Sequence, residues 1–168
     1  MYRMSIITLL APTSLRSTVN ISHATRLALV HDMAEAVVGD ITPQEKMPKS
    51  EKARRERDTM QFLAGTMLGS YDGGEQGREL VELWEEYEAG VTAEAKFVKD
   101  VDKLELLCQM VEYEMADAEA VKAGERDLWE FTHVATEIKG DEMKGWADEL
   151  MGERKRWWRE LGKEPRFK

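Results

Sequence analysis

Four side chains of types that do chemistry fall between positions 31 and 40 of a largely apolar stretch. His31 and Asp32 are adjacent, and Glu35 follows one helical turn later. Asp40 comes directly after Gly39, where the apolar run ends. Polar and charged groups are costly to bury unless they are paired, so their concentration here indicates a site. An imidazole beside a carboxylate is a donor set that suits divalent first-row metals such as Mn, Fe, Co or Zn.

Metal-assisted hydrolysis is the chemistry that this set could perform. If His31 and Asp32 bind a metal, Glu35 is free to act on a water at that metal or to protonate a leaving oxygen. On a continuous helix, Glu35 shares a face with both residues, because it lies four and three positions after them. The alternative is a core histidine whose hydrogen-bond partner is Asp32. Asp40 by itself is more typical of a loop cap.

A metal site needs further ligands, and carboxylates are better candidates than the two other histidines. His23 points about 80° away from His31 on a helix, and His133 lies in a polar segment, so we expect both at the surface. Asp100 and Asp102 flank an apolar stripe, which consists of Phe97, Val101, Leu104 and Cys108. Periodicity does not choose between the two aspartates, and the alternative is that both are solvated.

Only helices are expected among the elements that position these residues. They are predicted at about 1–10, 23–38, 51–68, 79–88, 92–115, 125–138 and 141–161. Ser22 is the expected N-cap of the second helix, Gly39 ends that helix, and Thr92 caps the fifth. No strand alternation, internal repeat or heptad array is present. The sequence therefore predicts an all-α protein, a compact bundle of about six or seven helices in one domain over 1–168.

Composition narrows the class of protein. The chain has 168 residues, of which 42% are hydrophobic and 34% charged, as in soluble globular domains. Its net charge of -9 argues against nucleic acid as a partner but not against a small phosphorylated ligand. No apolar run approaches the roughly 20 residues of a membrane helix, so no membrane partner is expected. The single Cys108 predicts a buried free thiol in a reducing compartment, the cytoplasm or alternatively the nucleus.

Three separated segments together carry a resemblance to a known family. In order, they read LALVHDMAEAVVGDITP, LWEEYEAG and TAEAKFVKDVDKLELLCQMVEYE, and they resemble the HD-domain 5′-deoxynucleotidases. The resemblance is strongest over 1–114 and weak in the C-terminal helices at 125–161. It implies an HD-domain helical bundle that hydrolyses deoxyribonucleoside 5′-monophosphates to deoxynucleoside and phosphate. It also implies a divalent metal ion (Mn, Co, Fe, Zn or Mg) and a homodimer.

The family's functional residues carry over by position. His31 and Asp32 match its paired metal ligands, and Asp102, rather than Asp100, matches its last ligand. Glu35 matches the acidic residue needed for catalysis, and Asp40 matches a second acid near the substrate and the attacking water. Family members also have a histidine ligand directly before the segment that corresponds to MYRM, whereas this chain begins at that Met. We therefore expect a weakened metal site in this chain.

Two alternative functions stay open at this point. One is an HD-type phosphohydrolase of another nucleotide or phosphoester. The other is a shortened HD-fold binding protein with impaired catalysis, which the absent histidine favours.

Three other features have structural interpretations. The charge run EKARRER at 51–57 is expected to be a solvated helix face. The aromatic residues Trp84, Tyr87, Trp129 and Trp146 are expected to make core or dimer contacts. The basic tail from 154 to 168 is expected to pack one of its two adjacent tryptophans.

Overall fold

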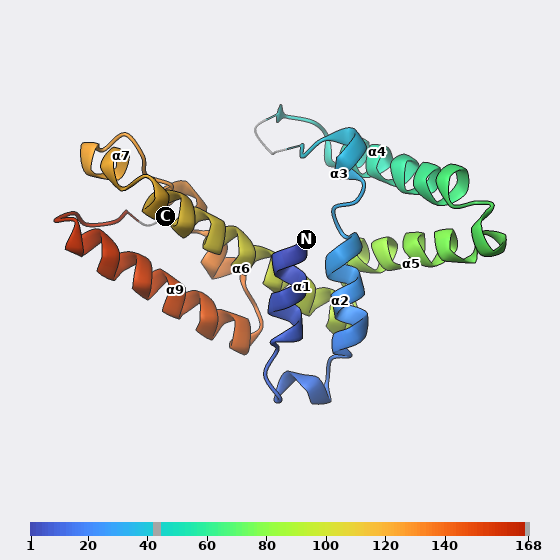
Figure 1. The fold of residues 1–168 in the computed structure, drawn as a ribbon, viewed down its shortest axis with the longest axis horizontal. Coiled ribbons are helices and arrows are strands. Elements are labelled where there is room, and N and C mark those ends of the chain that lie inside the picture. Colours follow the sequence, from blue (N-terminus) through green and yellow to red (C-terminus); the bar gives the residue numbers. More distant parts are fainter. Residues whose placement is uncertain (42–44, 167–168) are drawn as a thin grey trace. The chain divides into compact units, whose positions relative to one another are not determined.

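The computed structural model describes residues 1–41 and 45–166, and these residues form helices and turns without any strand (Figure 1). The predicted all-α class is confirmed. The chain divides into two compact units, Met1–Val98 and Lys99–Lys168, so the single domain stays a prediction. Within the described ranges, no helix has the length and apolarity needed to cross a membrane.

The first unit contains most of the helices. It begins with α1 (Tyr2–Leu9), η1 (Leu15–Ser17), α2 (Ile21–Val30) and α3 (Glu35–Val38). It continues with α4 (Lys49–Phe62), the π-helical η3 (Leu63–Met67), η4 (Tyr71–Gly74), α5 (Glu75–Ala89) and the start of α6 (Ala93–Ala116). In this unit α2 packs against α1 and α5, and α4 packs against α3 and α5 (Figure 1).

Helix α2 lies at the centre of the first unit. Its residues Ala24, Leu27 and Ala28 are fully buried. Its N-cap is Asn20, whose side chain accepts a hydrogen bond from the amide of His23 at 3.1 Å. The prediction of Ser22 as the cap was therefore wrong, because the chain becomes helical two residues earlier than the apolar pattern indicated.

The helix predicted over 23–38 is broken in the middle. Helix α2 ends at Val30, and α3 begins at Glu35. The imidazole Nδ1 of His31 lies 3.0 Å from the carbonyl oxygen of Ala28, which an unbroken α-helix would offer to the amide of Asp32. The amide of Glu35 instead bonds the carbonyl three residues back, as in a tight turn. The shared α-helical face of His31 and Glu35 is therefore not formed.

The chain turns sharply after α3. Gly39 has a φ of 79°, in the left-handed region that glycine adopts readily, and it ends the helix as predicted. Asp40 after it is exposed, whereas Ile41 is buried. The loop predicted over 40–50 includes Pro43, which lies outside the described residues.

The helices after this turn begin earlier than predicted. Helix α4 starts at Lys49, and α5 starts at Glu75, four residues before its predicted first residue. Gly90 ends α5 with a φ of 62°. Thr92 caps α6 as predicted, since its hydroxyl accepts a hydrogen bond from the amide of Ala95 at 3.1 Å.

The second unit consists of the larger part of α6 followed by α7 (Ala118–Ala123), η5 (Trp129–Phe131), α8 (Val134–Glu137) and α9 (Asp141–Glu160). The helix predicted over 125–138 was wrong. Glu114 accepts a hydrogen bond from the amide of Leu128, and Asp127 accepts one from the amide of Trp129, each at 3.0 Å. These side chains engage amides near the start of the predicted helix and favour short turns.

Helices α6 and α9 lie side by side and run in the same direction (Figure 1). The buried carboxylate of Glu114 accepts hydrogen bonds from the guanidinium of Arg154 at 2.8 and 2.9 Å and from the indole of Trp158 at 2.8 Å. The prediction that the tail packs one tryptophan is confirmed by the burial of Trp158. Cys108 on α6 forms no disulfide but is partly exposed, so its predicted burial was wrong.

Candidate active site

His31 and Asp32 form a close pair at the end of α2. The imidazole Nε2 lies 2.8 Å from the carboxylate Oδ2 of Asp32. The ring of Tyr87 on α5 packs against the imidazole, with 5.0 Å between the centroids. The His31 side chain is 1% exposed and that of Asp32 is 42% exposed, so the pair is anchored in the core and opens to solvent on one side.

The hydrogen bonds of His31 fit a divalent cation. If Nδ1 donates its proton to the carbonyl of Ala28, Nε2 presents a lone pair to the nearby carboxylate of Asp32. A lone pair on Nε2 and a carboxylate oxygen repel each other at 2.8 Å unless a positive charge lies between them. That charge is either a proton on the ring or a cation that both atoms bind. Metal-binding histidines commonly donate their other ring N–H to a backbone carbonyl in this way. The nitrogen and oxygen donors therefore suit a divalent metal ion.

Glu35 is the acid of the site whose pKa is shifted. Partial burial, followed by the charges of Asp32 and Asp40, raises its pKa from 4.5 to about 7. Glu56 acts in the same direction, and Lys52 opposes the shift. A carboxyl group with a pKa near neutrality can hold or release a proton at physiological pH, which suits a general acid or base.

Two residues of α4 belong to this site and were missed by the sequence analysis. Lys52 Nζ lies 3.7 Å from Glu35 Oε1 and 3.5 Å from Glu56 Oε1, and it donates a hydrogen bond to the carbonyl of Ile41 at 3.2 Å. Both residues belong to the charge run at 51–57 that was expected to be solvated. The signal was available, because Glu56 is spaced three and four residues from Thr59 and Met60, which are also buried.

The rest of the charge run behaves as predicted. Arg54 and Arg55 pair with Glu51 at 2.8–2.9 Å, and Arg54 also pairs with Asp58 at 2.6 Å. The Arg54 and Arg55 side chains are about half exposed, so this part of α4 is the solvated face that was expected.

Asp100 and Asp102 on α6 differ in what they contact. Asp100 is buried, and its carboxylate accepts hydrogen bonds from the amide of Lys139 at 3.2 Å and that of Gly140 at 2.7 Å. It therefore anchors the start of α9, and the alternative of two solvated aspartates is wrong for Asp100. Asp102 is partly exposed. The structure thus gives Asp100 a structural role, and Asp102 stays a predicted metal ligand.

The predicted site residues are divided between the two units. His31, Asp32, Glu35 and Asp40 lie in the first unit, and Asp102 lies in the second. Within 1–41 and 45–166 the structure assembles no group of three His, Cys, Asp or Glu side chains that could hold a metal ion. The three-ligand set stays a prediction.

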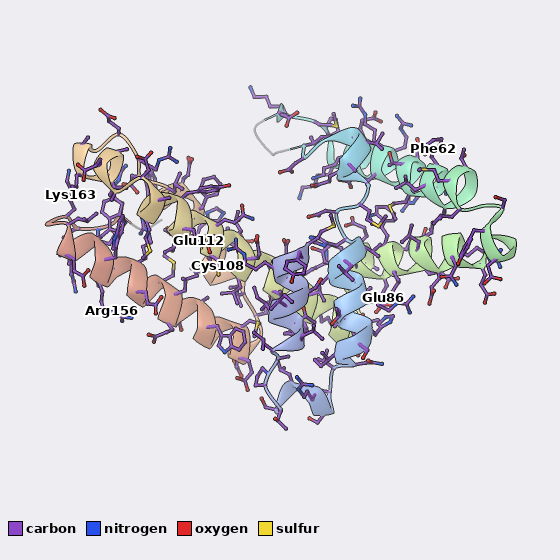
Figure 2. The ribbon with its side chains drawn as sticks, viewed as in Figure 1. Phe62, Glu86, Cys108, Glu112, Arg156 and Lys163 are labelled. Carbon is purple, nitrogen blue, oxygen red and sulfur yellow. The ribbon has the colours of Figure 1, made fainter. Side chains whose placement is uncertain are left out.

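The two other histidines contact residues outside the His31–Asp32 pair. His23 Nε2 lies 2.6 Å from the carboxylate of Glu86, which lies next to α2 (Figure 2). The side chain of His133 is 41% exposed, and its Nδ1 contacts the carbonyl of Glu130 at 2.7 Å.

The aromatic and apolar side chains around the site divide into core and surface. Trp84 and Tyr87 are buried in the core, as expected. Phe62, the last residue of α4, is 51% exposed and is labelled in Figure 2.

A helical fold, with a buried histidine paired to a partly exposed aspartate beside a carboxyl group of raised pKa, defines the class of this protein. The profile of the HD domain matches residues 1–149. The chain therefore belongs to the HD-domain family, as its motifs predicted. HD domains are metal-dependent phosphohydrolases, so the family implies a divalent metal ion.

Within that family, the chain is similar to proteins of one described activity. It is 40% identical to the 5′-deoxynucleotidase hdd1 of Schizosaccharomyces pombe, over 94% of this chain and 75% of the relative. It is 39% identical to the 5′-deoxynucleotidase YBR242W of Saccharomyces cerevisiae, over 96% of this chain and 64% of the relative. It is 46% identical to the human 5′-deoxynucleotidase HDDC2, over 68% of this chain and 52% of the relative. The chain thus spans half to three quarters of these relatives.

Solved structures agree with the fold. The HD domain-containing protein YGK1 superposes with a TM-score of 0.69 and 30% identity, covering 94% of this chain and 76% of that one. A protein described as a predicted metal-dependent phosphohydrolase from Magnetospirillum magnetotacticum superposes with a TM-score of 0.63 at 24% identity, covering 92% and 76%. These likenesses confirm the predicted HD-domain bundle.

Proposed function

We propose that this protein hydrolyses deoxyribonucleoside 5′-monophosphates to deoxynucleoside and phosphate. The observation that carries the proposal is the His31–Asp32 pair, with 2.8 Å between Nε2 and Oδ2, next to a carboxyl group whose pKa is about 7. The similarity to proteins described as 5′-deoxynucleotidases supports the choice of substrate.

His31, Asp32 and Asp102 are the proposed metal ligands. A divalent cation, when bound, supplies positive charge that polarises the phosphate ester and makes water a better nucleophile. Imidazole and carboxylate donors accept Mn, Co, Fe, Zn or Mg to different degrees, and this donor set favours the first-row transition metals among them.

Glu35 and Asp40 are the proposed catalytic acids. A water oxygen forms a bond to phosphorus while the bond from phosphorus to the 5′ oxygen breaks, and the departing oxygen must gain a proton. Glu35 can exchange that proton at neutral pH, because its pKa is near 7. Asp40, whose charge contributes to the raised pKa of Glu35, is the residue proposed to orient the attacking water.

Phosphate release from a panel of esters tests the proposed substrate. The panel holds the deoxyribonucleoside 5′-monophosphates, the matching ribonucleotides and p-nitrophenyl phosphate, with Mn²⁺ or Co²⁺ added. We expect release from the deoxyribonucleotides to exceed release from the ribonucleotides. Faster release from another ester supports a different HD phosphohydrolase, and no release from any ester supports a binding protein.

The assembly and compartment are further parts of the proposal. We infer a homodimer, because large apolar side chains at the start of the first unit are exposed: Tyr2 by 79%, Leu9 by 50% and Leu10 by 66%. Analytical ultracentrifugation tests this directly. A cytoplasmic location, with the nucleus as the alternative, is supported by a lone cysteine that forms no disulfide.

A further inference from the structure

Lys52 connects three segments of the first unit through one ammonium group. Its Nζ donates a hydrogen bond to the carbonyl of Ile41 at 3.2 Å and lies 3.7 Å from Glu35 and 3.5 Å from Glu56. These partners belong to the segment after Gly39, to α3 and to α4 itself. About a third of the side chain is exposed, so the contacts are made away from bulk water on most sides.

The bond to Ile41 fixes the segment that carries Asp40. Gly39 has a positive φ and no side chain that could hold this turn in place. Asp40 itself is exposed, so its position depends on its neighbours. The buried side chain of Ile41 and the hydrogen bond from Lys52 to its carbonyl provide that anchor.

The charge of Lys52 balances a strongly acidic surrounding. Partial burial opposes its charged form, but the carboxylates of Glu56 and Glu35 outweigh that effect and raise the pKa of Lys52. Asp40 contributes in the same direction. The ammonium group therefore stays charged at neutral pH and attracts both acids that the proposed reaction uses.

The neighbouring basic residues do not share this arrangement. Arg54 and Arg55 pair with Glu51 on the solvated face of the same helix. Lys49, at the first position of α4, is exposed. Lys52 thus differs from these neighbouring basic residues in the contacts that it makes, not in its charge.

We propose that Lys52 is a positioning residue for the phosphohydrolase reaction, holding Glu35 and the Asp40 segment in place from α4. This inference rests on the proposed function. It predicts that Lys52 acts mainly on turnover, because a displacement of about 1 Å in a reacting group can cost about 100-fold in rate.

The test compares K52M and K52R with K49M as the matched control. With a deoxyribonucleoside 5′-monophosphate and Mn²⁺, we expect K52M to lower kcat by about 10- to 100-fold while KM changes less than about 3-fold. K52R should recover most of kcat, and K49M should match the wild-type protein. Unchanged kcat in folded K52M, or a rise in KM alone, would overturn the positioning role. The second result would mean that Lys52 binds substrate.

A readout without activity separates this inference from the proposed function. The carbonyl carbon resonance of Ile41 should shift in K52M and not in K49M, because only K52M removes the hydrogen bond. If the wild-type protein releases no phosphate from any ester, the proposed function fails, and this resonance still decides whether Lys52 anchors the segment. An unmoved resonance overturns the anchor. If K52M does not fold, K52Q takes its place in both measurements.

Discussion

At the scale of single residues, the site depends on charges that are only partly compensated. Glu35 is surrounded by Asp32, Asp40 and Glu56, and Lys52 provides a nearby positive charge. The sequence indicated the acids, because their types and spacing are unusual in an apolar stretch. The sequence did not indicate Lys52. Its decisive contacts are with α3 and with the segment after Gly39, and spacing along α4 cannot predict contacts with other segments.

The raised pKa of Glu35 predicts a stability effect that depends on pH. In the folded protein without metal its pKa is about 7 instead of 4.5. Ionised Glu35 therefore destabilises the folded protein. This destabilisation is absent below about pH 4.5, where Glu35 is protonated in both the folded and the unfolded protein, and it is complete above about pH 7. We therefore expect E35Q to increase the free energy of unfolding by about 1–3 kcal/mol at pH 8, a value reduced for partial exposure.

Urea denaturation of metal-free protein at pH 5.5 and pH 8 measures this effect. The gain from E35Q should be clearly smaller at pH 5.5. E85Q, at an exposed position of α5, is the matched control and should change stability equally at both pH values. A gain from E35Q that does not grow with pH would contradict the electrostatic account of the site.

At the scale of elements, the sequence predicted the long helices well and the connections between them poorly. The predictions for α6 and α9 were close, because each has a sustained apolar stripe. The helix over 23–38 failed at His31, whose imidazole bonds a backbone carbonyl of its own turn. The helix over 125–138 failed because the carboxylates of Glu114 and Asp127 bind backbone amides there. Periodicity does not report such side-chain bonds.

The two aspartates of α6 should separate stability from metal binding. D100N weakens hydrogen bonds that Asp100 accepts from Lys139 and Gly140, so we expect a loss of about 1–3 kcal/mol in the free energy of unfolding. D102N, at a partly exposed position, should cost less stability than D100N and weaken Mn²⁺ binding instead. Urea denaturation and Mn²⁺ titration followed by electron paramagnetic resonance make the comparison. The reverse pattern would exchange the two assignments.

The buried ion pair between α6 and α9 should dominate the stability of the second unit. E114Q removes the carboxylate charge nearest to the guanidinium of Arg154, whose contact with Asp127 is longer at 3.5 Å, and we expect a cost of about 3–5 kcal/mol. E119Q, which removes the exposed pair with Lys122, is the matched control and should cost less than about 1 kcal/mol. Unfolding followed by tryptophan fluorescence measures both, because Trp158 bonds Glu114. Similar costs for the two variants would argue against a stabilising network.

At the scale of the whole molecule, the family could be predicted from three motifs because they occur in the same order. The match of the HD-domain profile to residues 1–149 confirms that prediction. The complete ligand set could not be established in the same way. His31 and Asp32 lie in one compact unit and Asp102 in the other, so the place of Asp102 in the ligand set stays a prediction.

His31 is the central proposed ligand of the metal at which a phosphate ester is cleaved. The most direct test is Mn²⁺-dependent phosphate release from deoxyadenosine 5′-monophosphate by the wild-type protein, H31Q and the surface control H133Q. Removing a residue that only supports a metal ligand typically lowers activity by roughly 10- to 100-fold. We predict that H31Q, which removes a ligand itself, lowers the rate of phosphate release by more than that, and that H133Q leaves the rate unchanged. Equal release by H31Q and the wild-type protein would contradict the account.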